Sequence, residues 1–163
     1  MEPRIETINE KKLIGRRAGM TLAADNTKEL WQYIMPRRSE IRNNLNEELL
    51  SVQLFNAYPD FKGFDHDSVF EKWAAIEVAD FSEVPEGFEM FTLPAGLYAI
   101  FHYKGAANAP GDTLYSIFTS WFPASAYNVD NDRPHFAVMG DKYKGNDPDS
   151  EEDICIPIKP KQS

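Results

Sequence analysis

The sequence has few of the residues, and none of the motifs, on which enzymes most often rely. Its 163 residues include one cysteine and three histidines. It contains no glycine-rich phosphate loop, zinc-ligand spacing, nucleophile elbow or dinucleotide-binding fingerprint. We therefore expect no cofactor and no metal, and we assign no catalytic residue. Asp65-His66-Asp67 is interpreted as a solvated loop, because three adjacent residues rarely converge on one ion.

The sequence also gives no indication of internal disulfide bonds or of membrane spans. The single cysteine, Cys155, excludes an internal disulfide framework, and its position between Ile154 and Ile156 predicts a buried thiol. No apolar run approaches the length of a membrane span, and the first residues lack the apolar core of a signal peptide. We expect a cytoplasmic protein that does not enter a membrane.

The net charge of the protein is strongly negative. Acidic residues number 26 and basic residues 17, which gives a formal net charge of -9. Such a field repels phosphate backbones and favours the approach of cations, so we expect no direct contact with nucleic acid. An acidic surface also keeps a small protein soluble, and charge alone therefore assigns no function.

Hydrophobic periodicity predicts an alternation of strands and helices. A helix is expected to begin near Thr27 behind a capping box formed by Asn26 and Glu29, and Pro36 should kink it or end its first half. A second helix should begin at Asp112 and end at Pro123. The expected strands cover residues 4–18, 51–57, 70–78, 88–92, 96–103, 134–139 and 153–158.

The order of these elements indicates an internal repeat within one domain that covers residues 1–163. Strand, helix, strand and strand follow one another over about residues 4–79 and again over about residues 96–158. The predicted fold class is α+β, with two main helices on a mostly antiparallel sheet. We expect a ligand cleft where the two halves meet, and no DNA-binding domain.

Aromatic and acidic residues on several of these elements form the candidate ligand site. A cation over an aromatic ring gains about 0.5 to 2 kcal/mol, and a nearby carboxylate adds charge complementarity. The predicted ligand-binding residues are Trp73, Glu77, Tyr98, Phe101, Trp121, Phe136 and Asp153. For each aromatic taken singly, core packing is the alternative. Glu77 discriminates between the two, because a buried carboxylate without a partner is costly.

Two histidines are left out of this site. His102 lies in an aromatic strand, and no serine, cysteine or lysine at a recognisable spacing would serve as its nucleophile. His135 lies between Pro134 and Phe136. Both are interpreted as packed, neutral side chains.

Six short segments, in order along the chain, resemble the GyrI-like family. They are Phe70-Glu71-Lys72-Trp73-Ala74, Val84-Pro85-Glu86-Gly87, Leu93-Pro94-Ala95-Gly96-Leu97-Tyr98-Ala99-Ile100-Phe101, Trp121-Phe122-Pro123, Arg133-Pro134-His135-Phe136 and Ile154-Cys155-Ile156-Pro157-Ile158. The resemblance implies a duplicated βαββ fold. The same fold serves as the effector-binding domain of AraC-type and MerR-type regulators, where it senses drugs and other organic ligands. Similar free-standing proteins sequester antibiotics or protect gyrase, and some are hydrolases.

One position departs from that pattern. Similar proteins often carry Glu directly after the Arg-Pro-His-Phe segment, and this chain has Ala137 there. The departure puts cation selectivity and catalysis in doubt. Asp153 stands where many relatives have Glu, and Glu77 would substitute in part if it points inward.

Three functional hypotheses remain at this stage. The first is a small-molecule-binding protein for effector sensing or drug sequestration, with a cleft for hydrophobic or cationic organic ligands. The second is a hydrolase that acts on reactive small molecules, which Ala137 disfavours. The third is a protein-interaction module for a transcription regulator or for gyrase.

Overall fold

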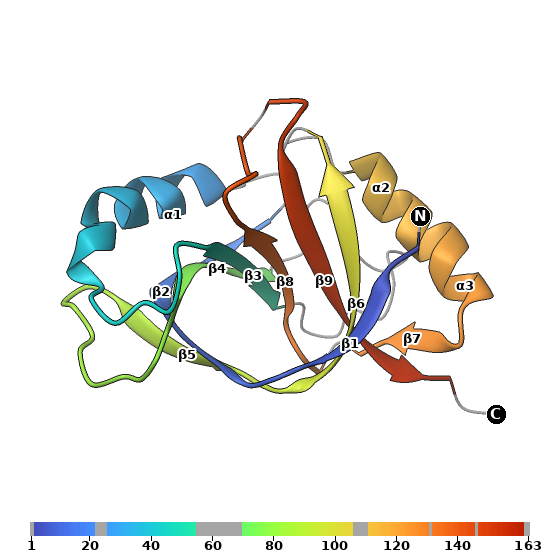
Figure 1. Ribbon diagram of the computed structural model, residues 1–163, viewed down its shortest axis with the longest axis horizontal. Helices are drawn as coiled ribbons and strands as arrows, with labels where there is room; N and C mark the ends of the chain where they lie inside the picture. The colour runs from blue at the N-terminus through green and yellow to red at the C-terminus, as the bar shows by residue number, and fades with distance from the viewer. Residues whose placement is uncertain are drawn as a thin grey trace.

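A computed structural model describes residues 2–21, 26–54, 70–105, 111–130, 132–145 and 147–161 (Figure 1). In these ranges the strands are β1 Arg4–Ile8, β2 Lys11–Met20, β3 Leu49–Leu54, β4 Phe70–Val78, β5 Glu89–Leu93, β6 Gly96–Lys104, β7 Tyr127–Val129, β8 His135–Met139 and β9 Glu151–Pro160. The helical elements are α1 Thr27–Ile34, the 3-10 helix η1 Met35–Glu40, α2 Gly111–Ser116, the π-helical segment η2 Ile117–Trp121 and α3 Phe122–Ala124.

The strands form one antiparallel sheet in the order β1-β6-β9-β8-β3-β4-β2-β5, with β7 added beside β9. Its centre is the pair β3 and β8, in which Val52 lies opposite Phe136. Outward from this pair, β4 and β2 follow on one side and β9 and β6 on the other. The predicted α+β class with a mostly antiparallel sheet is confirmed. A duplicated βαββ unit stays a prediction, with which the strand order is compatible.

Each edge strand of the sheet pairs with a strand that is not its neighbour in the sequence. Instead of one strand over residues 4–18, the chain breaks at Asn9 and Glu10 into β1 and β2. β1 pairs with β6, where Glu6 lies opposite Tyr98, while β5 pairs with β2. The prediction of a single strand is wrong because an edge position beside β6 requires the chain to cross the sheet before β2 begins.

The helices begin close to the predicted residues, with different ends. α1 starts at Thr27 as expected, yet Asn26 makes no side-chain capping bond, so the predicted capping box is wrong. Pro36 converts the continuation into η1, consistent with its missing N–H. Pro123 lies within α3 near its start, where proline is tolerated, and does not end the helix.

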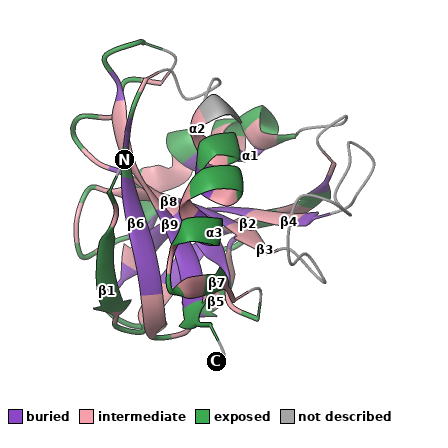
Figure 2. Cartoon of the chain, turned by 90° about the vertical axis from the view of Figure 1, so that its right-hand side faces the viewer, coloured by how far each residue is buried: buried purple, intermediate pink, exposed green. Residues whose placement is uncertain are grey.

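Both helical segments pack on the same face of the sheet. α1 buries Leu30 and Ile34 against β2 and β4. The second helical segment, which consists of α2, η2 and α3, buries Ile117 and Phe122 against β6 and β9. In Figure 2, β6 is buried along most of its length and β1 beside it is exposed. No helix among the described residues is long and apolar enough to cross a membrane.

A third core fills the opposite face of the sheet. It joins residues from both sides of the central pair, namely Leu13, Leu50, Val52, Trp73, Ala75, Leu93, Tyr98, Ile100, Phe136 and Cys155. The strand prediction for 70–78 anticipated these faces, because Trp73 and Ala75 belong to this core while Ala74 and Ile76 belong to the core under α1. Alternation along a strand therefore placed side chains correctly.

Several boundaries differ from the sequence prediction. β3 begins at Leu49, two residues early, and the predicted end of that strand lies outside the described residues, as does Asp65-His66-Asp67. β7 was missed, since three residues give too short a pattern. β9 extends to Pro160, which its pairing with β7 stabilises.

Gly15 of β2 permits the closest approach between strands. A Cβ atom at this position would lie 2.1 Å from the carbonyl oxygen of Ala74 on β4. We expect Gly15→Ala to lower the free energy of unfolding by about 1 to 3 kcal/mol, because backbone must move to admit the methyl group. Urea unfolding checks this. Gly140→Ala is the control, because its Cβ would meet Glu48 at an ordinary 3.6 Å. Equal effects of the two substitutions would contradict the account.

Candidate functional site

Three of the predicted ligand-binding aromatics lie together in the core on the helix-free face. Trp73, Tyr98 and Phe136 are 3%, 0% and 2% exposed. Tyr98 meets Phe136 edge-on, with ring centroids 5.1 Å apart, and Trp73 lies 5.2 Å from Phe91, which the sequence prediction missed. Tyr98 contacts Phe136, Trp73 contacts Phe91, and the three predicted rings are closed to solvent.

Two further predicted residues lie on the opposite face. Phe101 is fully buried beneath the second helical segment, and its ring meets Trp121 at 90° with centroids 5.2 Å apart. The sheet itself separates this pair from Trp73, Tyr98 and Phe136. The structure therefore does not bring the predicted aromatic set together into one cage.

Glu77 points to the helix-free face and is partnered there. Its carboxylate lies 3.5 Å from the ammonium group of Lys11, and its side chain is 14% exposed. The partner expected for a buried carboxylate is thus supplied by β2. Nearby, Glu71 accepts a hydrogen bond from Trp73 Nε1 at 2.8 Å, a contact that periodicity alone does not predict.

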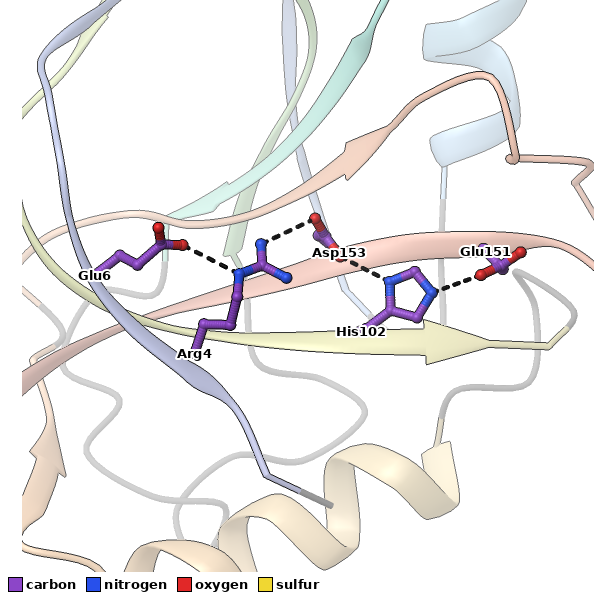
Figure 3. A network of polar contacts seen from close by, with 5 residues as sticks. All are labelled: Arg4, Glu6, His102, Glu151 and Asp153. Atoms are coloured by element: carbon purple, nitrogen blue, oxygen red, sulfur yellow. Dashed lines mark hydrogen bonds and ion pairs between the residues drawn. The ribbon is translucent and has the colours of Figure 1, made fainter.

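Asp153 belongs to a polar network at the end of β6 and β9 (Figure 3). Its Oδ1 lies 3.0 Å from His102 Nδ1, and the other ring nitrogen lies 2.6 Å from Glu151 Oε1. Arg4 extends the network to β1 through Asp153 at 3.5 Å and Glu6 at 3.2 Å. The network lies at the surface, since the His102 side chain is 51% exposed.

The expectation that His102 is packed and neutral is wrong. Ionised carboxylates accept and do not donate hydrogen bonds, so contacts to both ring nitrogens favour the protonated, charged imidazole. The bonds to Asp153 first, and to Glu151 second, raise the pKa of His102 above its ordinary value. His135 matches the expectation, because burial lowers its pKa to about 4 and keeps it neutral near pH 7.

Arg133, in the Arg133-Pro134-His135-Phe136 segment that resembles the GyrI-like family, has a structural role. Its Nη2 donates to the carbonyl oxygens of Leu97 at 3.0 Å and Ile158 at 2.8 Å, and its guanidinium lies 5.0 Å from the centroid of Tyr98. The Tyr98 hydroxyl donates to the carbonyl of Pro134 at 2.9 Å, and burial raises its pKa to about 12. These contacts fasten the segment before β8 to β6 and β9.

The two central strands present a different surface on the helix side. Pairing aligns Ala74, Ser51, Ala137, Ile154 and Phe101 in one row across β4, β3, β8, β9 and β6. Ala74 lies in the core with α1, and Phe101 lies in the core with the second helical segment. Between those cores, Ala137 stays partly exposed although its strand is central. Figure 1 shows β3 and β8 between the two helices.

We define the central face as the partly exposed residues on the helix side of strands β4, β3, β8 and β9, between the two helix-covered cores. They are Gln53, Lys72, Ala137, Glu152 and Ile154. Ser51 lies beneath them, 7% exposed, and accepts a hydrogen bond from Gln53 at 3.2 Å. The central face therefore combines small, amide, cationic and acidic groups in an area that the helices leave uncovered.

Glu152 is the functional candidate that the sequence prediction missed. It pairs across strands with Tyr103, and burial raises the pKa of its carboxyl, while the positive charge of Lys72 opposes that shift. Among the described residues, no side-chain hydrogen bond or ion pair engages its carboxylate. Adjacent strand residues point to opposite faces, so Asp153, the acid that the sequence prediction named, lies on the helix-free side. No local sequence signal identifies Glu152, because its pairing with Tyr103 joins strands that are distant in sequence.

Other candidate sites are weaker. Among the described residues, no group of three or more His, Cys, Asp or Glu side chains could hold a metal ion. A hollow of about 450 Å³ beside β7 and β9 is lined by Asn128, Lys159, Pro160 and Lys161. It contains none of the predicted site residues, and Lys161 already donates to the carbonyls of Phe122 and Pro123.

Residues 1–159 match the family model of the GyrI-like small molecule binding domain. The transcriptional regulator BrlR of Pseudomonas aeruginosa is 28% identical over 139 residues, which are 82% of this chain and 47% of BrlR. The chain thus spans about half the length of that relative.

Two solved structures share the fold. SAV2435 bound to tetraphenylphosphonium superposes with a TM-score of 0.73 at 15% identity, covering 98% of this chain and 94% of that one. EcmrR in a complex with DNA gives a TM-score of 0.70 at 11% identity, covering 98% of this chain and 58% of EcmrR.

The His102 network predicts a pH-dependent contribution to stability. A raised histidine pKa stabilises the fold below the unfolded value of about 6.5, and this stabilisation is lost as pH rises through the folded value. The stability difference between the wild type and His102→Gln should therefore shrink as pH rises above about 6.5. Urea unfolding at each pH measures it, and added salt should reduce it. A difference that does not vary with pH would contradict the charged imidazole.

Proposed function

Because the chain belongs to the GyrI-like family of small-molecule-binding domains, we propose that its ligand binds over the central face, between α1 and α2. The observation that carries this proposal is the partial exposure of Ala137 in a central strand. Inner strands of a sheet are normally covered on a face that carries helices. An uncovered position between two helices is a common location for a ligand.

The sizes of the side chains favour this face over the opposite one. Ser51 and Ala137 are small, so a bulky molecule can approach the sheet between the two helix-covered cores. On the helix-free face, Trp73, Tyr98 and Phe136 fill the equivalent space and are at most 3% exposed. A ligand there would have to displace packed aromatic rings, and interiors resist such changes.

We further propose that the ligands are hydrophobic or cationic organic molecules. The chain carries a net charge of -9, and Glu152 adds a partly buried acid to the central face. Tyr103 and Tyr143 supply aromatic surface near that acid. The fold relative SAV2435 was solved with tetraphenylphosphonium, a bulky organic cation. Effector sensing or drug sequestration would follow from such binding, and direct contact with nucleic acid forms no part of this proposal.

Filling the central face tests the location. Ala137→Phe should weaken the binding of tetraphenylphosphonium at least about tenfold, because the new ring occupies the ligand's space. Isothermal titration calorimetry measures the affinity. Ala79→Phe adds the same ring at an exposed position beyond β4 and should leave binding unchanged. Unchanged affinity in Ala137→Phe, with the fold intact by circular dichroism, would reject this location.

The aromatic set on the helix-free face is the alternative location. Trp73→Phe should lower the free energy of unfolding by about 1 to 3 kcal/mol, since it removes buried contacts and the Nε1 donor to Glu71. Its affinity for tetraphenylphosphonium should stay within about twofold of the wild type. A loss of affinity that exceeds the loss in Ala137→Phe would instead support binding beside Trp73.

A further inference from the structure

Three consecutive acids begin β9, and they point to two different faces. Glu151 and Asp153 lie on the helix-free side, where both contact His102. Glu152 lies between them in sequence and points to the helix side, opposite Tyr103. The sheet therefore separates Glu152 from two neighbouring acids that are already engaged by His102, and by Arg4 in the case of Asp153.

Side chains from several described elements surround the Glu152 carboxylate. Tyr103 faces it from β6, and Lys72 on β4 exerts a positive potential on it. Tyr143, in the segment between β8 and β9, has its pKa raised first by burial and second by the charge of Glu152. Burial keeps the Tyr143 phenol neutral near pH 7, and Lys72 is the charged group that acts on the Glu152 carboxylate among the described residues.

The central face lacks a charge at its middle. Ala137 on β8 lies between Ser51 and Ile154, none of which is ionisable. The charged groups stand to either side, with Lys72 on β4 and Glu152 on β9. A ligand over Ala137 therefore meets charge at its ends and uncharged side chains beneath it.

We propose that Glu152 determines which charge the ligand carries, selecting cations over anions of the same shape and coupling their binding to release of a proton. This inference rests on the proposed function, because it requires the ligand to lie over the central face. A partly buried carboxylate without a compensating bond is disfavoured in its ionised form. A bound cation restores that compensation, whereas a bound anion adds repulsion.

The direction of the pH effect follows from linkage. Burial raises the pKa of Glu152 in the free protein, and a nearby cation lowers it again. Binding of a permanent cation therefore favours the deprotonated form and strengthens as pH rises through this range. Binding of a permanent anion should weaken over the same range.

Two ions of almost the same shape and opposite charge distinguish an effect of ligand charge from an effect of ligand size. Tetraphenylphosphonium and tetraphenylborate carry opposite charges on four phenyl rings. We expect wild-type protein to prefer the cation by at least about tenfold near pH 8, and by less near pH 5. Glu152→Gln should reduce this preference to within about threefold and remove its pH dependence. Titration calorimetry of both ions with the full chain gives these values.

Asp153→Asn is the matched control, because it neutralises the adjacent acid on the other face. It should keep the wild-type preference for the cation. Lys72→Gln provides a second variant, which should strengthen cation binding by removing an opposing charge. Glu152→Gln is expected to fold, since it replaces a disfavoured buried charge with a neutral group of the same size.

The outcomes separate this inference from the proposed location. If neither ion binds the wild type, or if Ala137→Phe binds both normally, the proposed site fails and this inference fails with it. If Ala137→Phe weakens both ions while Glu152→Gln keeps the wild-type preference, only the role of Glu152 is overturned. Equal effects of Glu152→Gln and Asp153→Asn would also overturn it, because they would indicate a general effect of net charge.

Discussion

The antiparallel pairing of β3 with β8 is the constraint on which the rest of the structure depends. This pair joins the two sides of the sheet, with Ser51 opposite Ala137 and Val52 opposite Phe136. Since α1 packs on one side of the pair and the second helical segment on the other, the central strands lie between two separate helix-covered cores. The position of the candidate ligand site follows from that arrangement.

The same pairing gives the sheet two chemically different faces. Phe136 and Val52 turn toward the helix-free face, where residues from both sides of the sheet form one continuous core. Ala137 and Ser51 turn toward the helices, where small side chains leave room. One face therefore holds the two halves together, and the other carries the proposed ligand site. A one-residue change of register would exchange these roles.

Much of the fold could be predicted from sequence because strand alternation is a local property. The opposite faces of Trp73 and Ala74, and of Tyr98 and Phe101, follow from residue spacing alone. Which faces come together in space depends on pairing between distant strands, and for that reason the sequence prediction combined Trp73 and Phe101, which lie in different cores. The crossing of β1 to β6 was hidden for the same reason.

The errors at polar residues have a related cause. His102 was expected to be neutral because its two carboxylate partners lie about 50 residues away in β9. Glu152 was not selected because its place opposite Tyr103 depends on the pairing of β6 with β9, which alternation within one strand does not specify. Charged partners and solvent exposure are set by tertiary contacts, which periodicity does not specify.

The central claim is that ligands bind on the helix side of the central strands. Methyl-resolved NMR during titration with tetraphenylphosphonium tests it most directly, because Ala137 and Ala75 carry methyl groups on opposite faces of the sheet. The account predicts that the Ala137 methyl signal shifts with saturable dependence on ligand, while the signal of Ala75, in the core beside Trp73, stays in place. A shift of the Ala75 signal with none at Ala137 would contradict the account and locate the ligand on the helix-free face.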